Sequence, residues 1–210
     1  MVYMHITDGV VSLPVAGAAA AAAGVSLVYA VKNTKEEEIP RLSLLSGAFF
    51  VFSLISVPVG PTSVHPLLAG LLGIMLGVKA PIAIFIGLLL QALLFNHGGL
   101  TTLGVNLILV AVPALIAAKL FYVLKRLSVF TRAALVGGIG VMACVLLLVL
   151  LLLITDQLFA EGQFSVVNIL LIGYTPLMIV EAVVTGFAIN FLYRSRPGLL
   201  GLADNKAQSG

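Results

Sequence analysis

The chain has 210 residues, of which 61% are hydrophobic and only 9% are charged. So few charged groups cannot cover a water-facing surface, so the composition excludes an ordinary soluble protein and indicates an integral membrane protein. The net charge of +3 is spread over short loops rather than gathered in one basic patch, which argues against nucleic acid as a partner. With roughly 20 residues per span, we expect residues 1–210 to form one membrane domain.

Apolar stretches separated by short polar connectors predict an all-α fold, a polytopic membrane bundle of about seven transmembrane helices. Nothing basic precedes Lys32, so we expect no cleaved signal peptide and an attached first helix. Cys144 is the only cysteine and cannot form an intrachain disulfide, so we expect it to face lipid or pack inside. The expected spans are 11–31, 41–58, 66–78, 81–95, 104–123, 133–154 and 166–192. The spans at 66–78 and 81–95 are short, which predicts tilted, re-entrant or shielded helices.

The eleven lysines and arginines all lie in or beside alternate connectors. Because basic loops stay on the cytoplasmic side, this alternation predicts an external amino terminus and a cytoplasmic carboxyl terminus in a multi-pass protein of the cell membrane. The opposite loops hold no lysine or arginine. They hold all three histidines of the chain, His5, His65 and His97.

The segment Met4-His5 carries the clearest metal-binding chemistry. If the mature chain begins at Met4, its α-amine, the peptide nitrogen of His5 and the His5 imidazole can close two adjoining chelate rings on one ion. Deprotonating a peptide nitrogen favours late first-row ions, which indicates Ni²⁺ or Cu²⁺, with Co²⁺ possible. His65 is the expected fourth nitrogen donor, and His97 is the reserve candidate.

Each histidine also has an ordinary interpretation. His5 could be an exposed terminal residue, His65 could cap the helix that follows, and His97 could occupy a turn beside Gly98-Gly99. Their joint position on one side of the membrane favours the metal site over these separate explanations.

Three motifs carry a resemblance to a known family. They are Met4-His5-Ile6 with Asp8-Gly9, then Gly60-x-Thr62-Ser63-x-His65, and finally Gln91-Ala92-Leu93-Leu94-Phe95-x-x-Gly98-Gly99-Leu100-Thr101-x-Leu103-Gly104-x-Asn106. The sequence resembles the substrate-binding membrane subunits of cobalt and nickel importers of the energy-coupling-factor type, the CbiM/NikM family. The resemblance implies seven helices and an external amino terminus inserted into the fold. It also implies that the terminal amine and the second-residue histidine bind the metal together with His65.

The chain departs from the family pattern at two places. Met1-Val2-Tyr3 makes His5 the fifth residue rather than the second, which favours translation from Met4; removal of three residues or a different ligand set are the alternatives. The family usually has aspartate where this chain has His97. That residue therefore either coordinates the ion or orients a ligand imidazole.

The sequence has no Gly-x-x-x-x-Gly-Lys-Ser/Thr phosphate loop, so it cannot supply energy from ATP itself. The resemblance implies a membrane coupling subunit, two cytoplasmic ATPase subunits and often a small accessory membrane subunit. Co²⁺ or Ni²⁺ is then the transported substrate, and no catalytic cofactor is expected. The alternatives are an intramembrane metal-dependent enzyme or a stand-alone secondary carrier, but neither a His-Glu-x-x-His motif nor an inverted repeat is visible.

Two further features of the spans carry expectations. The tract Ala16 to Gly24 and the pair Gly73 and Gly77 have small side chains that let helices approach closely, within this fold or against the coupling subunit. Glu181 lies deep in the last span and should accept a structural hydrogen bond, for which Gln91, Asn106 and Asn190 are the candidate partners. The alternative is a role in a metal exit path or in ion coupling.

Overall fold

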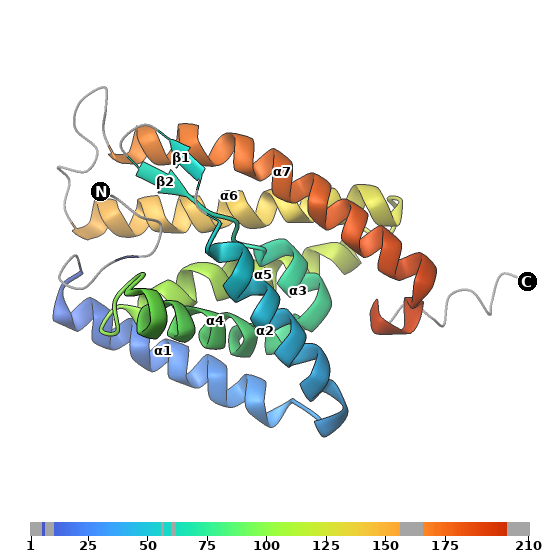
Figure 1. Ribbon diagram of the computed structural model, residues 1–210, viewed down its shortest axis with the longest axis horizontal. Helices are drawn as coiled ribbons and strands as arrows, with labels where there is room; N and C mark the ends of the chain where they lie inside the picture. The colour runs from blue at the N-terminus through green and yellow to red at the C-terminus, as the bar shows by residue number, and fades with distance from the viewer. Residues whose placement is uncertain (1–5, 7–10, 56, 60–61, 156–165, 201–210) are drawn as a thin grey trace, which may run out of the picture.

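A computed structural model describes residue 6 and residues 11–55, 57–59, 62–155 and 166–200. Within these ranges the chain forms seven α-helices and one short antiparallel hairpin (Figure 1). The helices coincide with the apolar stretches because a helix satisfies all of its backbone hydrogen bonds internally when water is absent. Their bounds are α1 Leu13–Lys32, α2 Ile39–Ser53, α3 Ala69–Leu76, α4 Ala80–Phe95, α5 Leu103–Val123, α6 Val129–Thr155 and α7 Val166–Ser195; the strands are β1 Val57–Val59 and β2 Thr62–Val64. Three 3₁₀ turns complete the described chain: η1 Glu36–Glu38, η2 Gly77–Lys79 and η4 Pro197–Leu200.

Five stretches are long and apolar enough to cross a membrane, and they confirm a predominantly helical, multi-pass membrane protein. They are Leu13–Lys32, Ala69–Phe95, Leu103–Val123, Val129–Thr155 and Leu170–Ser195. Helix α2 has only 15 residues, a length of about 22 Å against a hydrocarbon thickness of about 30 Å. Seven crossings and the orientation of the termini therefore stay predictions.

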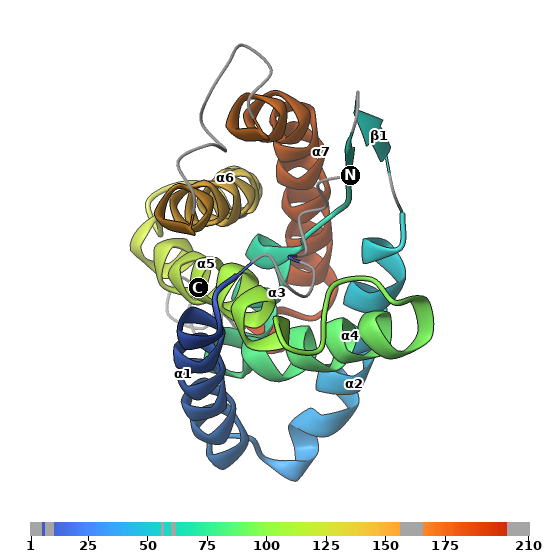
Figure 2. The ribbon, with the colours of Figure 1, turned by 90° about the vertical axis from the view of Figure 1, so that its left-hand side faces the viewer.

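Helices α3 and α5 lie in the middle of the bundle (Figure 2). Helix α5 packs against α1, α3, α4 and α6, while α6 and α7 form the most extensive helix pair. Cys144 on α6 is fully buried in this packing, as one of the two sequence interpretations expected. The central position of α3 explains how a helix of eight residues, about 12 Å long, is kept away from lipid.

The apolar stretch Ala69–Phe95 is long enough to cross a membrane by length alone, but it consists of α3, η2 and α4, and the two helices form an out-and-back hairpin rather than one continuous helix. His65 precedes α3 and His97 follows α4, yet the centroids of their rings lie 5.7 Å apart. The reversal occurs at η2, where Gly77 has φ of +55°, a conformation that glycine adopts without strain. Gly77 therefore serves the turn, and a side chain there would meet no neighbour in this chain, so Gly77 does not support close helix packing within the fold. Its alternative role, an approach by the coupling subunit, stays a prediction.

Gly73, the other member of that pair, does pack closely. A side chain at Gly73 would overlap the backbone of Ala114 on α5, so only glycine permits this approach. Gly70 likewise faces the backbone of Gly137 on α6. In lipid, where apolar side chains gain little by meeting each other, such close contacts stabilise helix association.

The small-residue tract of α1 is divided between two surroundings. Ala16 and Ala23 are buried, and the backbone of Ala20 lies against Gly104 of α5, so one side packs within the fold as expected. Gly17 and Ala21 are exposed on the other side.

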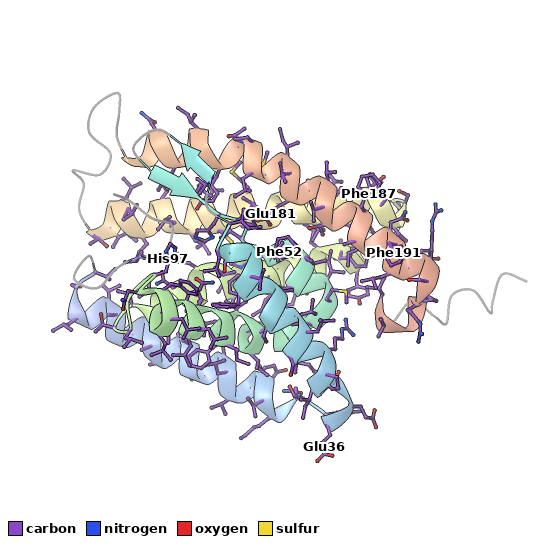
Figure 3. The ribbon with its side chains drawn as sticks, in the orientation of Figure 1. Glu36, Phe52, His97, Glu181, Phe187 and Phe191 are labelled. Atoms are coloured by element: carbon purple, nitrogen blue, oxygen red, sulfur yellow. The ribbon has the colours of Figure 1, made fainter. Side chains whose placement is uncertain are left out.

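The two ends of the bundle differ in charge. At one end Lys79 of η2 pairs with Glu38 of η1, and the Arg41 guanidinium donates to the carbonyl of Met75. The Lys79 partner is the main reason that the pKa of Glu38 lies below its usual value. Figure 3 places Glu36 at this end and His97 at the opposite end, which agrees with the partition of cations and histidines in the sequence.

The hairpin of β1 and β2 corrects the span expected at 41–58. Helix α2 ends at Ser53, and Val57 pairs with Val64 and Val59 with Thr62 in an antiparallel register. Two physical causes favour the extended chain: β-branched valines suit a strand, and the residue before Pro58 is pushed out of the helical region.

Candidate metal centre

His65 and His97 come from opposite ends of the α3–α4 hairpin and meet at the end of the bundle away from the cations. Their rings stand edge to face at 74°, with the 5.7 Å separation given above. His65 is 2% exposed, and His97 is half-buried. Two imidazoles at this separation can contribute to one metal site.

The surroundings of His65 favour the neutral imidazole that binds a metal. Burial, with a smaller contribution from the charge of nearby His97, lowers the pKa of His65 to about 4, although its contact with Pro66 acts in the opposite direction. The His65 Nδ1–H donates to the carbonyl of Pro66 over 3.3 Å. That tautomer directs the lone pair of the ring to Nε2, the nitrogen that can then coordinate an ion.

His97 is fixed by the way α4 ends. Asn96 adopts a left-handed conformation with φ of +49° and Gly98 follows with φ of +81°, so the chain turns sharply on both sides of His97. The His97 N–H donates to the carbonyl of Gln91 over 3.2 Å. Burial lowers the pKa of His97 as well, which favours the neutral form of the second imidazole too.

Ile6 is held inside the fold by polar side chains at the start of α5. Its N–H donates to Asn106 Oδ1 over 2.8 Å, and its carbonyl accepts from Asn106 Nδ2 at 3.0 Å and from the Thr102 hydroxyl at 2.6 Å. Ile6 is 4% exposed. Thr102 is the N-cap residue of α5 but makes no side-chain cap bond to that helix. Its hydroxyl instead joins Ile6 to the loop of His97, through a second contact with the Gly99 carbonyl at 3.3 Å.

Glu181 of α7 supports the segment that follows His65. Its carboxylate accepts from the N–H groups of Leu67 and Leu68, the latter at 3.0 Å, and the side chain is 2% exposed near the centre of the bundle (Figure 3). Leu68 has a left-handed φ of +50° just before α3. Two N–H groups at a strained helix entrance therefore find an acceptor in Glu181.

The structural role expected for Glu181 is borne out by these bonds, but its expected partners are wrong. Gln91 donates instead to the Ser53 hydroxyl, and Asn106 is engaged with Ile6. Backbone N–H groups were not considered as partners of Glu181. Every residue except proline carries one, and the sequence does not mark those that become buried.

Of the four residues predicted to bind metal, the structure brings together His65 and His97; Met4 and His5 lie outside the described residues. In the described part of the chain, no three His, Cys, Asp or Glu side chains gather as a metal site. Sequence reasoning missed the contribution of Thr102, and it quoted Asn106 in a motif without assigning its contact with Ile6. A signal was present: both are polar residues at the start of a strongly apolar helix.

Comparison with known proteins gives consistent matches over most of the chain. The sequence model of a family described as "Cobalt uptake substrate-specific transmembrane region" matches residues 5–199. A provisionally named metal transport protein of Haemophilus influenzae is 35% identical over 214 residues, covering 96% of this chain and 99% of that protein. The fused nickel transport protein NikMN of Rhodobacter capsulatus is 32% identical over 142 residues, which are 64% of this chain and 39% of that protein. The crystal structure of a truncated transition metal transporter superposes with a TM-score of 0.76 at 25% identity, covering 91% of this chain and 99% of that chain.

Proposed function

Because the chain belongs to the family of cobalt-uptake substrate-specific transmembrane proteins, we propose that it is the metal-capturing subunit of an ATP-driven importer of the energy-coupling-factor type. It takes up Co²⁺ or Ni²⁺ at the external face of the cell membrane and delivers the ion inward. The metal is the transported substrate, and the chain acts as a transport component rather than as an enzyme.

The proposed capture site combines the α-amine of Met4, the peptide and ring nitrogens of His5, and the ring of His65. His97 either completes this set or orients the His65 ring. The observation that carries the proposal is the set of hydrogen bonds from Asn106 and Thr102 to Ile6, since they hold the residue next to His5 inside the fold. The buried, neutral imidazole of His65 supports it as well.

Energy and partners follow from the family. The sequence lacks a phosphate loop, so the proposal includes two cytoplasmic ATPase subunits and a membrane coupling subunit. A fused relative such as NikMN supports the presence of a further membrane component. Where that component is not fused, a small accessory subunit would supply it as a separate chain. The exposed side of α1, with Gly17 and Ala21, is a plausible face for the coupling subunit.

Calorimetry on purified chains tests the capture site. A chain that begins at Met4 should bind Ni²⁺ or Co²⁺ tightly, and acetylating its terminus, His5→Ala or His65→Ala should each abolish high-affinity binding. Lys79→Gln, at the opposite end of the bundle, is the control and should bind normally. Unchanged affinity after acetylation and in both histidine variants would refute the chelate.

A further inference from the structure

A cavity of about 560 Å³ lies at the cationic end of the bundle, opposite the histidines. It opens between the end of α5, the start of α6 and the end of α7, which gather at the right of Figure 1. Its polar lining consists of Lys125, Ser128, Arg132 and the two tyrosines Tyr122 and Tyr193. The proposed metal site uses none of these residues.

Arg132 is the lining residue that most clearly indicates a bound ligand. The residue is only 6% exposed, and its guanidinium lies over the ring of Phe121 with 4.1 Å between Cζ and the ring centroid. Its Nε is buried without a hydrogen-bond acceptor, and no carboxylate of the described residues pairs with the guanidinium. A buried cation without an anion is costly, so a ligand that supplies negative oxygen atoms would be stabilised here.

The remaining lining also favours an anion. The cavity lies at the N-terminus of α6, a helix of 27 residues, whose unpaired N–H groups and dipole attract negative charge. Ser128 shapes this terminus by accepting the Thr131 N–H over 3.1 Å. Lys125 adds a second cation at the exposed mouth, and no acidic residue of the described chain lines the cavity.

We propose that this cavity binds the phosphate group of an anionic membrane phospholipid. The cavity lies where membrane-spanning helices end, which is the level of lipid headgroups, and tyrosines are common lining residues at that depth. Exposed apolar side chains on the same helix ends, Val123 and Phe191, leave the neighbouring surface open to acyl chains; Figure 3 shows Phe191 near the end of α7. Basic pockets between helices on the cytoplasmic side are suited to such headgroups.

Native mass spectrometry of the purified full chain, titrated with phosphatidylglycerol, tests the proposal. The wild-type chain should retain the lipid, and Arg132→Gln should weaken its binding about tenfold or more, the size expected for losing hydrogen bonds to a charged group. Arg126→Gln is the matched control, because Arg126 is an exposed cation of the same connector outside the cavity. It should change binding by no more than about twofold, since Arg126, unlike Lys125, does not line the cavity and an exposed charge outside it is screened.

Further measurements distinguish a lipid phosphate from free phosphate, and further variants distinguish lost binding from misfolding. Diacylglycerol, which lacks phosphate, should not be retained, and millimolar inorganic phosphate should not displace phosphatidylglycerol. Arg132→Lys should recover part of the binding, and Lys125→Gln, which alters only an exposed residue, should weaken it severalfold.

Several results would overturn the proposal. Equal losses in Arg132→Gln and Arg126→Gln would indicate unspecific charge attraction, and a wild-type chain that retains no phosphatidylglycerol would leave the cavity without its ligand. Equal retention of diacylglycerol would show that the cavity does not recognise the phosphate group. Full displacement by inorganic phosphate would make the free ion, and not a lipid, the ligand.

Discussion

Removing the hydrogen bonds between Asn106 and Ile6 should weaken metal binding, although Asn106 is not a proposed ligand of the ion. Asn106→Ala deletes the acceptor of the Ile6 N–H at 2.8 Å and a donor to its carbonyl at 3.0 Å, while the Thr102 hydroxyl still contacts that carbonyl. A buried N–H without an acceptor costs about 1–3 kcal/mol, and a lost second bond adds about 1 kcal/mol. The total of about 2–4 kcal/mol corresponds to an affinity roughly 30-fold to nearly a thousandfold lower, because docking of the terminus and metal binding are linked in the proposed site.

Calorimetry with Ni²⁺ on a chain that begins at Met4 measures this effect. Asn33→Ala is the matched control: it also deletes an asparagine side-chain bond of 2.8 Å, to the Tyr29 carbonyl, but at an exposed position at the cationic end. Its affinity should stay within about twofold of the wild type, the usual range for a surface change. Equal affinities for Asn106→Ala and the wild type would refute the argument that a docked amino-terminal segment forms the site.

Three other substitutions probe the support of the site. Glu181→Ala leaves the N–H groups of Leu67 and Leu68 buried without their acceptor, so thermal unfolding in detergent should reveal a loss of about 2–5 kcal/mol; an unchanged melting temperature would contradict this. Gly73→Ala should lower the free energy of unfolding by about 1–3 kcal/mol, because the added methyl group overlaps α5. Gly17→Ala is the control and should be neutral, because a side chain there meets nothing. Equal effects of the two substitutions would contradict the close packing of α3 on α5. His97→Asp should retain bound metal if residue 97 orients a ligand, and complete loss of metal would instead indicate direct coordination.

The helices could be predicted because their length and apolar character are dictated by the membrane. The span expected at 104–123 is α5 at Leu103–Val123, and even the short α3 and α4 were anticipated from the distance between polar breaks. The β1–β2 hairpin was missed because Val57-Pro58-Val59 continues an apolar run, and only the proline hints at an extended chain.

The candidate site could be predicted only in part. Charge alternation predicts that the three histidines share one side of the membrane, with His65 as a donor to the Met4-His5 chelate and His97 in reserve. The structure places the rings of His65 and His97 side by side, whereas the chelate itself stays a prediction. The edge-to-face arrangement of the two rings depends on the reversal at Gly77, which a single glycine in an apolar run does not reveal. The bonds from Leu67 and Leu68 to Glu181 were equally hidden, because backbone N–H groups carry no sequence signal.

In the proposed function, a nitrogen-rich site at the end of the bundle away from the cations holds the transported ion. X-ray absorption spectroscopy of the Ni²⁺-loaded chain beginning at Met4 tests it most directly. We expect a first coordination shell made of nitrogen, with imidazole scattering that decreases in His65→Ala. A shell dominated by oxygen or sulfur, or a spectrum that His65→Ala leaves unchanged, would contradict it.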